Sequence, residues 1–260
     1  MGAISDAFNS AWTFRVLVAC RMASGRSLLL IADIGGYTDY MRSHRMSLAH
    51  AEVNTGRLLE KVIDAAPQFE LIEIEGDAAF LAHQVDPSDG DATVDLTVQA
   101  AMAMHREFHL ERHNVATNLC PCASCAQATN LKLKFVAHIG EVATQTIRQR
   151  RKLVGIDVIL VHRMLKNPVD VPEYLLLSEE LYNTSSTPMP GPAHEVAQDL
   201  EGIGPVREYF MDVRTSRVRF RPCRIHPCSD AWATPWPLPA RACRTCWACA
   251  ADPGPRPLDG

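Results

Sequence analysis

The sequence predicts an α+β fold with a βαββαβ core, in which an antiparallel sheet carries its helices on one face. Three observations support this prediction. Short apolar runs of strand length alternate with longer segments of helical period, a tight-turn signal joins two of the strands, and 47% of the 260 residues are hydrophobic against 22% charged. That composition suits one large globular domain or two small ones.

Charge and hydropathy exclude two kinds of partner. The formal net charge of −4 gives no electrostatic argument for binding nucleic acid or an anionic membrane surface. No apolar run approaches the roughly 18 residues that a membrane span needs. We therefore expect neither nucleic acid nor a membrane as a partner.

The first half of the predicted core reads strand, helix and hairpin. Residues 28–34 form a continuous apolar run that predicts a buried strand. Residues 46–66 place apolar side chains partly at helical spacing, and Pro67 ends that helix. Residues 69–84 predict two strands around a tight Gly-Asp turn.

The second half repeats the alternation. The expected elements are a helix at 88–113, a strand at 131–147, a helix at 155–167, a strand at 173–182 that ends in a turn or short helix, a loop at 184–195 and a last strand at 204–213. The order β-α-β-β-α-β-α-β contains the ferredoxin-like βαββαβ arrangement.

Composition divides the chain into three parts. We expect residues 1–26 to be a disordered N-terminal extension and residues 27–220 to be the folded domain, with a cysteine-rich insert at 118–129. Residues 221–260 are rich in Pro, Arg and Cys without any period, which predicts a disordered tail.

The segment LVAC at 17–20 is similar to a lipoprotein cleavage site. The residues before it contain Asp6, gain a positive charge only at Arg15 and have a very short apolar core, unlike a secretory signal. We therefore expect a cytoplasmic protein. Translation could begin at Met1 or at Met22, since the organised pattern starts only after both.

Two carboxylates occupy corresponding places in the predicted sheet. Asp33 ends the first strand and Asp77 lies in the turn of the following hairpin. These elements are neighbours in a ferredoxin-like sheet, so both carboxylates are expected at one edge, where they repel unless a cation lies between them. Mg²⁺ and similar hard ions take such oxygen ligands together with substrate phosphates. Gly35-Gly36 leaves backbone amides uncovered for an anion at the start of a helix.

Four short elements resemble class III nucleotidyl (adenylyl and guanylyl) cyclases. They are DIGGYT at 33–38, IEGDAAF at 74–80, AHIGEV at 137–142 and KLVGIDVILVHRMLKN at 152–167, and they follow the family's order within about residues 27–185. The resemblance implies the class III cyclase-like version of the ferredoxin-like fold. The sequence is also similar to an uncharacterised bacterial family with this cysteine insert.

The resemblance also implies site residues. Asp33 and Asp77 would hold Mg²⁺ or Mn²⁺, Arg163 would be the transition-state arginine, and Glu73 and Lys152 occupy the purine-selecting positions. Five consecutive residues would hold phosphates with their backbone: Ile34, Gly35, Gly36, Tyr37 and Thr38. Because the family's sites form between two catalytic domains, a homodimer is implied, with a nucleotide or another phosphorylated small molecule as ligand.

The chain departs from the family at the ribose and purine positions. Ile159 stands where the family has its catalytic asparagine, and an isoleucine cannot orient a ribose by hydrogen bonding. Glu73 is similar to the guanine-selecting type, whereas Lys152 fits neither purine type. We expect weak or absent cyclase activity; an active protein would be a phosphorus–oxygen lyase of the nucleotidyl cyclase type. The alternative is a non-enzymatic, zinc-containing regulatory or interaction module with a vestigial cleft.

The insert offers three thiols within six residues. Cys120, Cys122 and Cys125 have spacing that suits structural zinc, with unligated thiols or an iron–sulfur cluster as alternatives. The fourth zinc ligand stays open among three candidates: His113, Cys223 and Cys228. The run CRTCWAC at 243–249 favours free cysteines in a disordered segment. The basic run at 148–152 favours a solvated turn or loop, with phosphate contact as the alternative.

Overall fold

The computed structural model describes residues 24–86, 90–186, 189 and 191–215. The chain divides into two units, Met1–Val218 and Arg219–Gly260, and every described residue lies in the first. Most of the predicted extension and the whole predicted tail, including CRTCWAC, lie outside the described residues.

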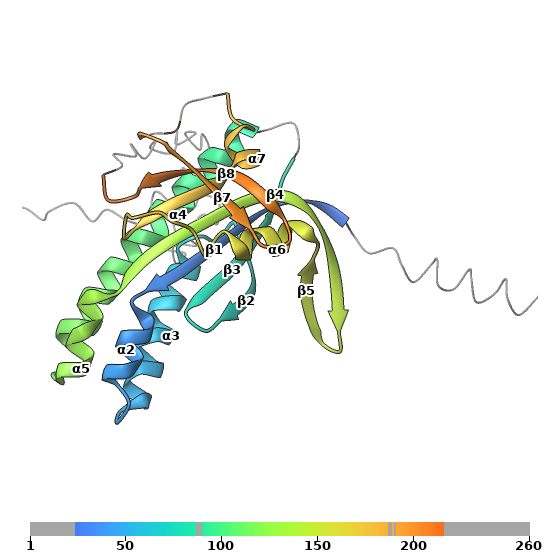
Figure 1. The fold of residues 1–260 in the computed structure, drawn as a ribbon. Helices are drawn as coiled ribbons and strands as arrows, with labels where there is room; N and C mark the ends of the chain where they lie inside the picture. The colour runs from blue at the N-terminus through green and yellow to red at the C-terminus, as the bar shows by residue number, and fades with distance from the viewer. Residues whose placement is uncertain (1–23, 87–89, 187–188, 190, 216–260) are drawn as a thin grey trace, which may run out of the picture. The chain divides into compact units, whose positions relative to one another are not determined.

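The described unit is built on one eight-stranded sheet (Figure 1). Its strands are β1 (Ser24–Gly35), β2 (Glu70–Glu75), β3 (Ala78–Gln84), β4 (Lys132–Ile147), β5 (Arg150–Val154), β6 (Tyr174–Ser178), β7 (His194–Leu200) and β8 (Gly204–Asp212). The strand order is β2-β3-β1-β4-β6-β8-β7, and β5 pairs with β4. Only the β4–β6 pair is parallel among the described strands.

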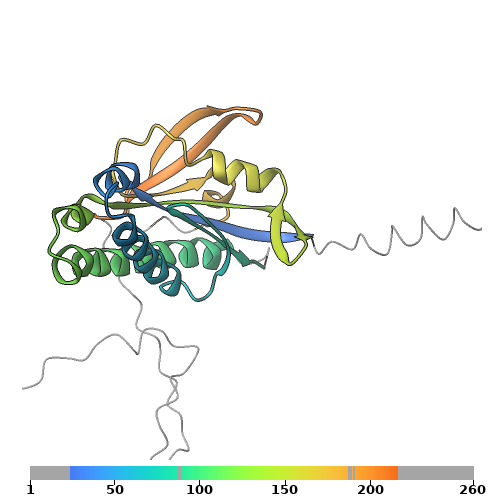
Figure 2. The same ribbon diagram turned by 90° about the horizontal axis from the view of Figure 1, so that it is seen from below.

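Helices flank both faces of this sheet (Figure 2). The long helices α3 (Leu48–Asp64) and α4 (Gly90–Asn114) share one face with the main hydrophobic core, and α6 (Ile156–Arg163) packs on the other. The short helical segments are α2 (Tyr37–Ser43), η1 (Val115–Leu119), α5 (Ala123–Ala126), η2 (Gln127–Asn130) and α7 (Glu179–Tyr182). Among the described helices, none is long and apolar enough to cross a membrane.

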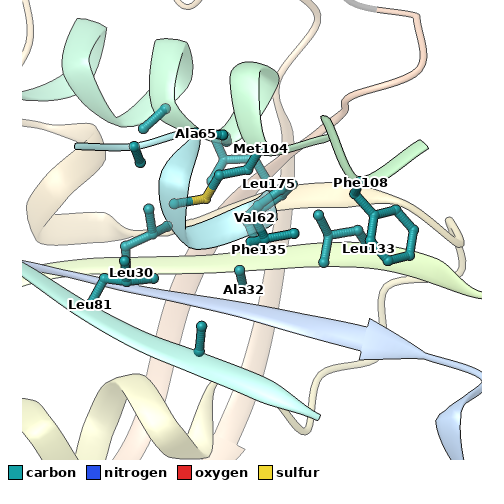
Figure 3. Packing of buried hydrophobic residues seen from close by; sticks show 14 of the residues in the cluster. Leu30, Ala32, Val62, Ala65, Leu81, Met104, Phe108, Leu133, Phe135 and Leu175 are labelled. Carbon is teal, nitrogen blue, oxygen red and sulfur yellow. The ribbon is translucent and has the colours of Figure 1, made fainter. Parts of the chain in front are cut away.

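The central strand β1 explains why its sequence is apolar without alternation. Leu28 and Leu30 face the core that includes α3 and α4, whereas Leu29 and Ile31 face the smaller core under α6. A strand covered on both faces needs apolar side chains at every position. Figure 3 shows the larger core, where Leu30 and Phe135 of the sheet pack with helix side chains such as Met104.

The predicted α+β class and the βαββαβ core, formed by β1, α3, β2, β3, α4 and β4, are confirmed, and the core helices α3 and α4 share one face of the sheet as predicted. Helix α6 lies on the other face, which the prediction of helices on one face did not include. Several elements have no bounds in the prediction, among them the short helical segments η1, α5 and η2 of the insert region. The basic run expected as a turn or loop forms much of β5, and residues 194–200, expected partly as loop, form the edge strand β7. Helix α2 begins directly after Gly36, whose backbone φ of 82° breaks the strand.

Ion pairs explain why a charged segment forms β5. Arg151 pairs with Glu70, and Lys152 donates to Glu73 at 3.0 and 3.2 Å. Both acidic partners lie on β2, so opposite charges on two edge strands face one another. Local sequence patterns cannot report such a partner from another strand.

Gly140 of β4 lies directly against Asp157 of helix α6. A Cβ there would overlap the Asp157 carboxylate, whose Oδ2 accepts a hydrogen bond from the Glu141 amide at 2.7 Å. We expect Gly140→Ala to lower the free energy of unfolding by about 1–3 kcal/mol through overpacking. Urea unfolding measures this change.

Gly56 supplies the matched control for that measurement. It lies inside α3, and a Cβ there meets nothing within 4 Å. Gly56→Ala should stabilise the protein by up to about 1 kcal/mol, because alanine favours a helix interior. The close-approach argument is wrong if Gly140→Ala is as stable as the wild type.

Candidate functional site

The ends of β1 and of the β2–β3 hairpin bring Asp33 and Asp77 together. Asp33 pairs in register with Ala78, and the Ile34 amide donates to the Asp77 carbonyl at 3.1 Å. Partial burial, and then the charge of Asp33, raise the pKa of the Asp77 carboxyl. The two residues therefore lie at the same end of neighbouring strands, where the charge of Asp33 disfavours ionisation of Asp77.

A lysine lies beside this carboxylate pair. Lys134 of β4 is opposite Asp33 in register, and its Nζ lies 2.9 Å from Asp33 Oδ2. Burial lowers the pKa of Lys134, but its contact with Asp33 more than offsets this and the net pKa is raised. Without a metal, the ammonium supplies the positive charge that the carboxylates require. Sequence reasoning missed Lys134, since its position depends on the β1–β4 register.

The predicted phosphate segment runs from the carboxylates to a surface hollow. Ile34 is buried in the core, and Gly36 adopts a left-handed φ at the start of α2. A Cβ on Gly36 would meet the Asn130 carbonyl at 3.4 Å. The open hollow that follows is lined by Tyr37, Thr38, Met41, Arg42 and Arg45. This segment therefore connects the Asp33 and Asp77 pair with a hollow that contains Arg42 and Arg45.

The two predicted purine-selecting residues contact one another. Lys152 Nζ lies 3.0 and 3.2 Å from the carboxylate oxygens of Glu73, where β5 approaches β2. Both side chains are partly exposed. In this structure the Lys152 ammonium therefore hydrogen-bonds to Glu73 and not to a purine.

Arg163 lies at the end of α6 and is 36% exposed. Its guanidinium is 3.8 Å from Glu201 in the β7–β8 turn, so its ion partner in the described chain is not one of the aspartates. Ile159, one turn earlier on α6, is 48% exposed. Arg163 and Ile159 therefore both lie on α6, whereas Asp33 and Asp77 lie at the end of β1 and in the β2–β3 turn.

The three insert thiols meet a histidine from α3. His50 Nδ1 lies 3.8 Å from Cys120 Sγ, 3.7 Å from Cys122 Sγ and 3.6 Å from Cys125 Sγ. All four ligand atoms lie within 4.8 Å of one another. Sulfur and nitrogen ligands of a tetrahedral zinc ion are separated by about 3.6 Å. The group therefore fits a Cys₃His metal site.

His50 is a ligand candidate that the sequence did not reveal. Of the candidates expected from the sequence, His113 does not belong to this group, and Cys223 and Cys228 lie outside the described residues. No spacing rule links His50 to thiols some 70 positions away. Only the packing of α3 against the insert brings them together.

Buried polar side chains support this cluster. Asn54 Nδ2 donates to Cys125 Sγ at 3.3 Å and to the Tyr40 hydroxyl at 2.8 Å, and His44 Nε2 lies 3.7 Å from the same sulfur. The Cys125 amide, together with His50, lowers the pKa of the Cys122 thiol to about 6. Burial, and then the neighbouring thiols, raise the pKa of Cys125 to about 11. Such outer contacts orient metal ligands.

Glu208 is a buried carboxyl away from both clusters. It is 1% exposed, and its Oε2 accepts from Gln198 Nε2 at 2.8 Å. Its Oε1 has no hydrogen-bond partner among the described residues. Burial raises its pKa to about 7, against the opposing hydrogen bond from Gln198.

Because the pKa of Glu208 is raised, we expect the free energy of unfolding to depend on pH. The unfolded chain releases the proton near pH 4.3 and the folded chain near 7, so stability falls as pH rises between these values and then levels off. Glu208→Gln removes the effect. We expect the variant to be about 2 kcal/mol more stable than the wild type at pH 8 and little different at pH 4.5. Urea unfolding with the same stability difference at both pH values would contradict this assignment.

The sequence of this chain is similar to one protein family and to one mycobacterial protein. The family described as "Protein of unknown function (DUF2652)" matches residues 55–174. The chain is 40% identical over 161 residues to the uncharacterized protein Rv2561/Rv2562 of Mycobacterium tuberculosis, which covers 62% of this chain and 74% of that protein.

Solved structures with a similar fold are class III cyclase domains. The adenylyl cyclase CyaB from Pseudomonas aeruginosa is 17% identical, with a TM-score of 0.53 over 74% of this chain and 97% of that one. The guanylate cyclase domain of RhGC from Catenaria anguillulae, in complex with GTP, is 16% identical, with a TM-score of 0.52 over 72% and 95%. A class III adenylyl cyclase-like ATP-binding protein from Pseudomonas aeruginosa is 16% identical, with a TM-score of 0.53 over 63% of this chain and 35% of that one.

Proposed function

Because the chain belongs to the family of the mycobacterial protein Rv2561/Rv2562 and has the fold of class III nucleotidyl cyclases, we propose that it is a cyclase-homology domain that binds a divalent metal and a phosphorylated ligand. The metal is Mg²⁺ or Mn²⁺ at Asp33 and Asp77, and the ligand is a nucleotide or another phosphorylated small molecule. The observation that carries the proposal is the meeting of these two residues at one end of the β1–β3 pair, where the charge of Asp33 contributes to the raised pKa of Asp77.

The surroundings of the carboxylates support a phosphorylated ligand. The segment from Ile34 to Thr38 continues into a hollow that also contains Arg42 and Arg45. Arginine guanidinium groups favour phosphate, because their N–H donors match its oxygens. A similar fold in a protein described as ATP-binding agrees with a nucleotide. A bound divalent ion would supply charge neutralisation for the phosphates.

Cyclase activity is weak or absent in this proposal. Ile159 cannot hydrogen-bond a ribose, and Lys152 and Glu73 satisfy one another rather than a purine. Were cyclisation to occur, the ribose 3′-hydroxyl would attack the α-phosphate and pyrophosphate would leave. Arg163 would then stabilise the developing negative charge.

A second copy of the chain is the proposed partner. Four large apolar side chains on β2 and α6 are 39–58% exposed: Leu71, Ile74, Ile156 and Ile159. A contact of 3.4 Å between His162 and Glu75 joins these two elements. Neighbouring exposed apolar groups favour an interface. We expect sedimentation of the wild type to report a dimer that Ile159→Lys dissociates; a monomeric wild type would contradict this.

Zinc at the Cys₃His cluster is the second part of the proposal. The ligand separations of 3.6–3.8 Å and the soft sulfur donors favour zinc over Mg²⁺. This cluster, together with the Lys134–Asp33 ion pair, favours one alternative function: a non-enzymatic regulatory module whose old cleft is vestigial.

Ligand binding separates these functions. We expect Mn²⁺ with ATP or GTP to raise the Tm of the wild type, and Asp33→Ala and Asp77→Ala each to abolish the rise. Asp64→Ala, which changes an exposed carboxylate at the end of α3, should retain it. The same samples, assayed for cyclic nucleotide, should contain little or none. If neither nucleotide stabilises the wild type at any metal concentration, the metal–nucleotide proposal is wrong and the vestigial module stands.

A further inference from the structure

A second group of metal-ligating side chains lies apart from both clusters described above. His105 and His109 are four residues apart on α4, so their side chains share one face of the helix. Their Nε2 atoms are 3.0 Å apart. Glu173, just before β6, reaches both, with Oε1 2.8 Å from His109 Nε2 and Oε2 3.4 Å from His105 Nε2.

We propose that His105, His109 and Glu173 bind a zinc-class divalent ion that keeps an open position for water. Nitrogen and oxygen ligands at about 2.0–2.1 Å from a tetrahedral zinc ion are separated by about 3.3 Å. The separations of 2.8–3.4 Å need only small rotations to reach that geometry. Two imidazoles with one carboxylate favour zinc, cobalt or a similar ion over Mg²⁺ or Ca²⁺, which prefer oxygen ligands.

The carboxylate is held in place by the fold. Glu173 is 4% exposed in its side chain, and its Oε1 accepts from the Leu133 amide at 3.1 Å. Its backbone carbonyl accepts from the Val213 amide at 3.3 Å. The nearby Arg112 guanidinium donates instead to the Leu131 carbonyl at 2.7 Å. Among the described residues, the side chains that contact this buried carboxylate are therefore those of the two histidines.

The imidazoles have the access and the orientation that a metal requires. Their side chains are 15% exposed at His105 and 25% exposed at His109, so an ion and a water ligand can reach them. Phe108, which is fully buried, packs edge-on against the His109 ring at 5.4 Å. When both Nε2 atoms bind an ion, neither carries a proton, and the close nitrogen–nitrogen approach needs no shared proton.

The spacing His-x₃-His on one helix face is that of zinc sites. In the hydrolytic form of this motif a glutamate directly follows the first histidine, but here Arg106 holds that place. The three residues therefore make a metal site with an accessible coordination position but without a glutamate base after the first histidine.

Cobalt titration of the full chain tests the site. We expect the wild type to bind one Co²⁺ ion that lacks a sulfur-to-cobalt charge-transfer band, because this site has no sulfur ligand. His105→Gln and His109→Gln should each bind that ion at least tenfold more weakly. His113→Gln, which alters an exposed histidine on the same helix, should bind as the wild type does. Asp33→Asn should also keep this ion, which separates the site from the carboxylate edge.

A measurement on the wild type covers the case in which the variants fail to fold. Long-range ¹H–¹⁵N spectra report which imidazole nitrogen carries the proton. Zinc should convert His105 and His109 to the Nδ1–H form, whereas His50, bound through Nδ1, should become Nε2–H. The proposal is overturned if the spectra of both rings stay the same when excess zinc is added. It is also overturned if folded His109→Gln still binds the Co²⁺ ion that lacks the sulfur-to-cobalt charge-transfer band.

Discussion

Replacing His50 with alanine is expected to lower zinc affinity at the cysteine insert by more than about a hundredfold, since even outer contacts of a metal site are typically worth 10–100-fold. His50 is the one non-sulfur member of the group, and its Nδ1 lies within 3.8 Å of all three thiols. The free energy of unfolding should fall by about 3–5 kcal/mol, because loss of a structural metal is among the largest single-site effects.

The matched control for this change is His113→Ala. His113 is exposed on α4 and is one of the three candidates for the fourth ligand that the sequence leaves open. Mass spectrometry measures the zinc content, and urea unfolding of the same samples measures the free energy of unfolding. Both quantities should be the same in His113→Ala as in the wild type. Equal zinc loss in both variants would refute the assignment of His50, and unchanged zinc in Cys122→Ser would refute the cluster itself.

Lys134→Met is expected to raise Mn²⁺ affinity at the carboxylate edge about tenfold, which corresponds to about 1.4 kcal/mol. The ammonium lies 2.9 Å from Asp33 in a partly buried setting and competes with any cation for that oxygen. Without metal the variant should be less stable by about 1–2 kcal/mol, because Asp33 loses its counter-charge. Added Mn²⁺ should restore the stability.

Lys132→Met is the control, since Lys132 lies two residues away on the same strand and is paired in register with Gly35. Isothermal titration with Mn²⁺ measures both variants. If Lys134→Met loses stability that Mn²⁺ does not restore, the lysine and Asp33 form a purely structural ion pair.

The parts of the molecule that the sequence predicts are those set by local pattern. The apolar run of β1, the helical period of α3 and the Gly-Asp turn after β2 each depend on neighbouring residues. The meeting of Asp33 and Asp77 follows from this order, because a hairpin beside the first strand carries both to one edge.

The parts that it does not predict depend on register and packing. Lys134 faces Asp33 only because β1 and β4 pair in one register, and a shift by one residue would turn it to the other face. His50 reaches the insert, and Glu173 reaches His109, through contacts between elements far apart in the chain. The β5 segment forms an edge strand because acidic residues of β2 lie opposite it.

The most direct test of the carboxylate site is the anomalous scattering of Mn²⁺ in crystals grown with a non-hydrolysable ATP or GTP analogue. We predict a peak bridging Asp33 and Asp77, at about 2.1–2.2 Å from a carboxylate oxygen of each, with phosphate density over residues 34–38 and the Lys134 ammonium displaced from Asp33. Manganese found only elsewhere, for example at His105 and His109, with Lys134 still on Asp33, would contradict the proposed function.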